Sequence, residues 1–352
     1  KKAKTPVKGG GSQELGWHQK PIHLAAAAAE ALGHIGTPDA AKVLVEAYPT
    51  LGDFWYYTYR TGDHDWLMGS HASVLHFRIA EAFDAMGSRD LGAIVPHILR
   101  SVPIDSDRGI LLENDGYETL VARVVQRSGQ TAAVMETCLA VLGDPQAKAA
   151  EPLRAAVTAS PPAVSTGVLC PESRAAHLAS VVCLDGRWAA RLRAALERYR
   201  AAEPSRKRSW VCFMLARTLG KIRDRDSVDV LASALTEDPT EASLGLEPPP
   251  SVFVYKAMTP FYRAAAAYAL GRIGDERAAA CLVAAVSDFD NAVDVRYSAA
   301  QGLELLGPGP HLAELRKLAA EYPEVATRRV LLRACRQSGA AAVAVAPTPH
   351  AP

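Results

Sequence analysis

The sequence lacks the short motifs that mark common catalytic and nucleotide-binding sites. It contains no G-x-G-x-x-G or Walker phosphate loop and no G-x-S-x-G nucleophile elbow. The six cysteines include no C-x-x-C pair, and most lie among apolar neighbours, as reduced core thiols do. These absences favour a non-enzymatic role for this chain by itself, and we expect no cofactor, no metal and no catalytic residue.

An excess of charge of one sign and long apolar runs are also missing. The net charge is +1 over 352 residues, which weighs against a dedicated nucleic-acid binder. No stretch approaches the roughly 18 apolar residues of a membrane span, and none alternates cleanly enough to indicate a strand. No signal peptide is visible, and together with the scattered unpaired cysteines this favours a cytoplasmic location.

What the sequence does contain is a repeated helical unit. Between Tyr262 and Gly307, an Ala-rich helix ends at L-G-R-I-G, Asp275 caps a second helix, and Arg296 opens the next unit. The step from Gly271 to Gly307 is 36 residues, a period typical of solenoids. Such a helix pair cannot bury its apolar face alone, so we expect it to stack on copies of itself.

The sequence pattern that begins at Arg263 resembles the HEAT-like repeat of the phycobiliprotein-lyase (PBS lyase) type. It reads R-x-x-A-A-x-A-L-G-x-I-G-D-x-x-A. Asp294-Val295-Arg296 is similar to the D-V-R that commonly opens that repeat. The resemblance implies a right-handed α-solenoid of stacked antiparallel helix pairs. Its family name also implies an alternative role, that of a lyase-like chaperone for tetrapyrrole attachment.

The predicted organisation is all-α, with about seven to eight helix pairs over residues 21–338. Long inter-repeat insertions are expected near residues 49–70, 103–115, 160–172 and 237–259. Residues 1–20, basic and Gly-rich, are expected to be a flexible linker, and the Ala/Pro-rich residues 339–352 a disordered tail. Because the chain begins Lys1-Lys2 without Met, we expect a fragment or a processed form of something longer.

The first insertion holds eight of the chain's aromatic residues between Tyr48 and Phe77, with polar side chains among them. Loops longer than about 12–15 residues are usually functional or disordered, and aromatic faces beside polar groups suit a ligand or partner. The predicted binding residues are Phe54, Trp55, Tyr56, Tyr57, Tyr59, Arg60, Asp63, His64, Asp65, Trp66 and His71. The alternative interpretation is that these aromatics plug the groove or cap the end of the solenoid.

The second irregularity is a basic segment, 187–225, with twelve Lys and Arg against three acidic residues. Arg187 and Arg191 share a helix face, as do Arg217 and Lys221, because each pair is four residues apart. The candidate basic cluster comprises Arg187, Arg191, Arg206, Lys207, Arg208, Arg217 and Lys221. Clustered arginines can grip phosphate, but a solvated face balanced by nearby acids is the simpler interpretation.

The function predicted from sequence is a non-catalytic helical-repeat scaffold. It would bind a protein partner, or another domain of a longer chain, through its concave face and the aromatic insertion 53–66. One alternative is the helical-repeat portion or accessory subunit of a larger enzyme, which includes the tetrapyrrole-lyase-like role. The other is a binder of the nucleic-acid backbone through the basic segment 187–225.

Overall fold

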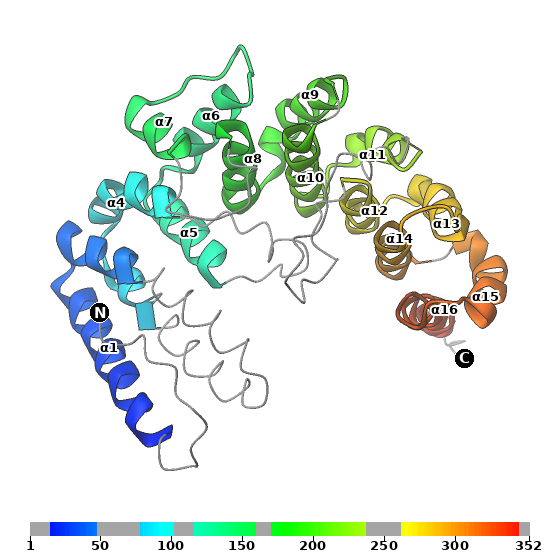
Figure 1. Ribbon diagram of the computed structural model, residues 1–352, viewed down its shortest axis with the longest axis horizontal. Helices are drawn as coiled ribbons and strands as arrows, with labels where there is room; N and C mark the ends of the chain where they lie inside the picture. The colour runs from blue at the N-terminus through cyan, green and yellow to red at the C-terminus, as the bar shows by residue number, and fades with distance from the viewer. Residues whose placement is uncertain are drawn as a thin grey trace, which may run out of the picture. The chain divides into compact units, whose positions relative to one another are not determined.

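The computed structural model describes residues 15–47, 78–101, 116–159, 170–236 and 262–344, apart from residues 80, 204 and 308. Every regular element in these ranges is a helix, and no strand occurs among them, so the predicted all-α class is confirmed (Figure 1). The chain divides into two compact units, and the division falls within α6 (Thr131–Val141). Each unit is described by itself.

The first unit contains α1 (Leu15–Ile35), helical segments at 38–47 and 78–85, α4 (Ser88–Ser101) and α5 (Gly116–Arg127). α4 packs on α5, and both Arg123 and Arg127 hold the Asp84 carboxylate, at 2.9 and 2.8 Å. Between α1 and the 38–47 segment, Gly36 has a positive φ of 66°, as Gly274 and Gly307 have after later helices.

The second unit carries the longest run of repeats. Its elements after α6 are α7 (Glu151–Val157), α8 (Pro171–Val182), α9 (Ala189–Arg200), α10 (Arg206–Lys221), α11 (Val228–Ala234), α12 (Tyr262–Ile273), α13 (Ala279–Ser287), α14 (Val293–Leu306), α15 (Leu312–Glu321) and α16 (Val325–Ala344). Short 3₁₀ turns precede α9, α11, α13 and α15.

The helices of this unit form two rows. In the inner row α8, α10, α12, α14 and α16 pack each on the next, and α9, α11, α13 and α15 pack on the inner helices that follow them (Figure 1). Two of the inner helices are buried almost all round: no residue of α8 from Ser173 to Val182 is exposed, and in α12 only Tyr268 and Arg272 are partly exposed. This is the stacking of helix pairs expected for a solenoid.

Glycines set the closest approach between inner helices. A Cβ on Gly220 would lie 2.7 Å from the Cα of Ala269, and one on Gly271 would lie 2.7 Å from the carbonyl carbon of Gly302. Gly271 therefore lies inside α12, where it admits the neighbouring backbone, and of the two glycines only Gly274, after the helix, has a left-handed φ, 73°.

The repeat step is shorter than the sequence indicates. Gly274 and Gly307 hold the same left-handed position after their helices, at φ 73° and 87°. Arg263 and Arg296 both lie in the first turn of their helices and bind carbonyls of the preceding segment, so both pairs give a step of 33 residues (307 − 274 and 296 − 263). The 36-residue step is wrong because it pairs a glycine inside α12 with a glycine after α14.

Helix extends beyond the boundaries suggested by composition. α1 begins at Leu15, within the predicted linker 1–20, and α16 runs to Ala344, within the predicted tail 339–352. The extension of α16 adds a run of alanines, the residue with the highest helix propensity. No helix among the described residues is long and apolar enough to cross a membrane.

Candidate functional site

The aromatic insertion lies outside the described residues, together with every binding residue predicted in it, from Phe54 to His71. The members of the basic cluster, by contrast, lie on α10, at the start of α9 and, for Arg187, in the 3₁₀ turn before α9. Arg206 is the first residue of α10, Arg217 is half-buried in it, and Arg187 and Lys207 lie on the surface. The site is therefore built from the basic cluster and the polar groups that meet it.

Arg191 of α9 is the most heavily engaged member of the cluster. Its Nε donates to Asp144 at 2.6 Å, and its two Nη atoms donate to the Glu136 carboxylate at 2.6 and 3.0 Å. These hydrogen bonds hold the pKa of Glu136 below its usual range. Burial alone would raise the pKa of Asp144, but hydrogen bonds from Arg191 and the Gln146 amide outweigh burial and lower it. Arg191 thus fastens α9 to the preceding helix pair.

Arg187 binds Asp185 within the turn between α8 and α9. Its guanidinium donates to both oxygens of Asp185 at 2.8–3.0 Å, and its backbone N–H donates to Asp185 Oδ1 at 3.0 Å. The pKa of Asp185 is lowered by the hydrogen bond from the Arg187 side chain. The guanidinium groups of Arg187 and Arg191 also lie 5.7 and 5.6 Å from the ring centre of buried Trp188, within cation–π range.

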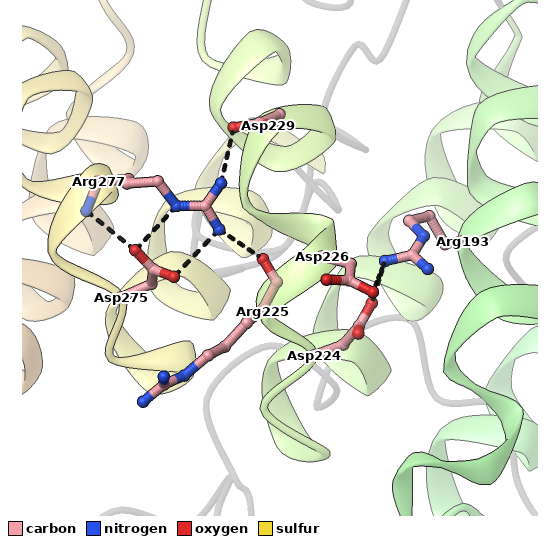
Figure 2. Close-up of polar contacts among 7 residues, drawn as sticks. All are labelled: Arg193, Asp224, Arg225, Asp226, Asp229, Asp275 and Arg277. Carbon is pink, nitrogen blue, oxygen red and sulfur yellow. Dashed lines mark hydrogen bonds and ion pairs between the residues drawn. The ribbon is translucent and has the colours of Figure 1, made fainter.

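The same Asp-x-Arg arrangement recurs before α13. Arg277 donates to Asp275 Oδ1 from its backbone N–H and its Nε, both at 3.1 Å, and the side-chain bond lowers the pKa of Asp275. Figure 2 shows the guanidinium also reaching the preceding pair, with the Arg225 carbonyl at 3.0 Å and Asp229 at 3.5 Å. Arg277 thus binds Asp275 in its own turn and also links the pair of α12 and α13 to the preceding pair.

Arg193 of α9 binds the turn before α11, the turn that contains Arg225. Its Nη1 lies 3.1 Å from Asp224 and 3.3 Å from Asp226, which flank Arg225 in the turn before α11 (Figure 2). Asp224 also accepts from the Ser227 hydroxyl. We call this side of the second unit, with Asp144, Asp185, Asp224 and Asp275 in successive turns, the turn edge.

A second polar line runs along the loops between pairs, which we call the loop edge. Arg263 of α12 donates to the Leu235 carbonyl at 2.6 Å and to the side-chain oxygen of Asn291. Arg296 of α14 donates to the carbonyls of Phe289 and Asn291, at 2.8 and 2.5 Å, and to Glu324. Arg263, Asn291 and Arg296 are 7, 7 and 5 % exposed, so this line is buried.

Two further members of the basic cluster cap helix ends. Arg208 donates to the carbonyls of Tyr199 and Arg200, at 3.1 and 2.9 Å, and Lys221 donates to those of Ser180 and Val181, at 2.9 and 3.1 Å. These carbonyls close α9 and α8, where intrahelical partners run out and a cation is favourable. Lys207 pairs with Glu172 at 2.7 Å.

Most members of the basic cluster therefore bind groups of their own chain. Carboxylates or carbonyls of the second unit accept from Arg187, Arg191, Lys207, Arg208 and Lys221. A phosphate would have to displace these contacts, which weighs against the nucleic-acid alternative. No group of three or more His, Cys, Asp or Glu side chains in the described part of the chain could hold a metal ion.

The family described as PBS lyase HEAT-like repeat matches residues 24–48 and 262–288. The second match covers α12 and α13, and the first covers the end of α1 and the 38–47 helix. The chain is a HEAT-like repeat protein. No curated protein matches it. Its HEAT-like repeats thus occur in both units, at the two places where L-G-x-I-G is complete.

Sequence reasoning missed most of the partners in these contacts. Glu136, Asp144 and Asn291 carry no motif and were not candidates, although each binds an arginine that sequence analysis had noted. One usable signal was present: an aspartate followed two residues later by arginine, at Asp185 and Asp275, directly after an inner helix.

Proposed function

We propose that this HEAT-like chain is a non-catalytic scaffold that binds a protein partner, or another domain of a longer chain. The binding surfaces would be the concave face of the repeat stack and the aromatic insertion 53–66. The observation that carries the proposal is the unbroken inner row from α8 to α16, in which each helix packs directly on the next. A stack of this kind offers an extended, preorganised surface, which is how repeat proteins bind.

The polar contacts support the same proposal. Guanidinium groups at both edges bind carboxylates and carbonyls of neighbouring helix pairs, so they hold the stack together. A long insertion with many aromatic residues adds the kind of side chain that dominates protein interfaces.

The test is the Trp55→Ala variant, compared with wild type by a melting curve and by capture of partners from native lysate, identified by mass spectrometry and then titrated. We expect nearly unchanged melting and a loss of about 2 kcal/mol or more of binding, the scale of an aromatic anchor. Leu332→Ala, which removes an exposed apolar side chain of α16, is the control. Unchanged affinity with a stability loss of about 3–5 kcal/mol would make Trp55 a core residue and defeat the proposal.

A further inference from the structure

Three large apolar side chains are exposed together at the loop edge of α14 and α16. Phe289, Val293 and Val325 are 51, 52 and 51 % exposed. Val293 and Val325 are the first residues of α14 and α16, which pack side by side (Figure 1). Single exposed apolar residues are ordinary on protein surfaces, but three on one edge form a patch.

Contacts between the loop before α14 and the loop before α16 hold this patch in place. The ring of Phe289 lies 5.3 Å from that of Tyr322, whose hydroxyl donates to the Val286 carbonyl at 2.7 Å. Arg296 lies 5.5 Å from the Phe289 ring centre and joins the loop before α14 to Glu324. Phe289 is therefore held by Tyr322 and Arg296 while about half of its side chain stays exposed.

The charge beside Phe289 and Val293 is negative. Asp288, Asp290 and Asp294 form no ion pair with any of the described residues, and the guanidinium of Arg296 in the same helix is buried and bound to Glu324. Asp294 is half-buried next to Val293, and burial raises its pKa. Arg328 and Arg329 of α16 lie one turn after Val325, so the acidic groups concentrate around Phe289 and Val293.

We infer that Phe289, Val293 and Val325, with Asp294 beside them, form a docking surface for a partner segment that presents a Lys or Arg next to an apolar side chain. The apolar side chain would cover the two valines and the open side of Phe289, and the cation would meet the aspartates. The charge pairing would fix the register and direction of the segment, as complementary charges do at interfaces. This inference deepens the proposed function and rests on it.

The test selects a displayed library of random short peptides on the immobilised chain and measures the affinity of the enriched peptides. We expect enriched sequences to place Lys or Arg beside Leu, Ile or Phe. Their affinity should fall about tenfold or more, or by about 1.4 kcal/mol, on the Val293→Ser/Val325→Ser variant. It should also fall on Asp294→Asn and with added salt. The matched control, Leu305→Ser/Leu332→Ser, removes similarly exposed leucines from the same two helices and should leave affinity unchanged.

Three outcomes would overturn the inference: no enrichment, enrichment of acidic or uncharged peptides, or equal binding to the valine variant and wild type. Melting curves of both double variants establish that they fold. A natural partner that depends on Trp55 but binds the valine variant normally would sink this inference alone and leave the scaffold proposal standing.

Discussion

The two polar edges of the second unit use the same groups in different surroundings. At the Arg277 end of the turn edge, the side chains of Arg277 and Asp229 are 55 and 87 % exposed, so water competes for their contact. At the loop edge, the Arg296 side chain is 7 % exposed and its partners are a carboxylate and two backbone carbonyls. Exposed ion pairs contribute little, whereas removing one partner of a buried pair is strongly destabilising. The loop edge should therefore dominate coupling between repeats.

The largest effect is expected from Arg296→Met. The change keeps most of the apolar stem but leaves the Phe289 and Asn291 carbonyls without their donor and Glu324 without its cation. We expect urea unfolding to show a loss of about 3 kcal/mol or more of stability, the scale for breaking a buried charge contact. Adding Glu324→Gln should recover part of that loss. A loss below about 1 kcal/mol for Arg296→Met would mean that the loop edge contributes no more to stability than the turn edge.

The next effect concerns backbone packing between the edges. Gly271→Ala introduces a methyl group into the backbone of Gly302, and we expect a loss of about 1–3 kcal/mol, typical of overpacking. Gly186→Ala is the control, because nothing lies within 4 Å of a Cβ at that position. Equal melting temperatures for the two variants would show that the inner helices can separate freely.

Arg191→Ala, at the partly buried end of the turn edge, should have an intermediate effect of about 1–2 kcal/mol. The pKa values of Glu136 and Asp144 are lowered in the folded state. Their contribution is present above the unfolded values of about 4 and is lost as pH falls through the folded ones. The variant should therefore lose less stability than wild type between neutral and acidic pH. Parallel curves of unfolding free energy against pH would contradict this assignment.

The smallest effect is a gain. Arg223 has a φ of 56°, the left-handed position that Gly274 occupies after α12, and only glycine adopts it without strain. Arg223→Gly should stabilise by up to about 1 kcal/mol, measured by thermal or urea unfolding, because strain relief exceeds the entropy that glycine adds to the unfolded chain. Gly274→Ala should move stability in the opposite direction. A destabilised Arg223→Gly would show that the Arg223 side chain contributes more to the turn edge than its backbone loses.

The local part of this architecture could be predicted from sequence, because it depends on neighbours along the chain. The Asp275 cap bonds two residues ahead, and Gly274 closes the helix just before it. The edges could not be predicted in the same way. Arg191 binds carboxylates 47 and 55 residues earlier in the chain, at distances that no helical spacing encodes.

The role of Gly271 was missed for a related reason. A glycine near a helix end predicts a cap, and only the neighbouring helix reveals that a close approach requires it instead. The candidate binding residues divide similarly: the described members of the basic cluster bind groups of the same chain, and most of these partners come from other repeats. The aromatic insertion stays a prediction, since its residues lie outside the described ranges.

The most direct test of the central claim is a pair of double-mutant cycles, one at each edge. The first removes Arg296 and Glu324 singly and together, and the second does the same with Arg277 and Asp229, at low and high salt. We predict a coupling energy above about 1 kcal/mol that persists at high salt for the buried pair, and no measurable coupling at physiological ionic strength for the exposed pair. Equal couplings at the two edges, or a buried pair whose coupling vanishes with salt, would contradict the account.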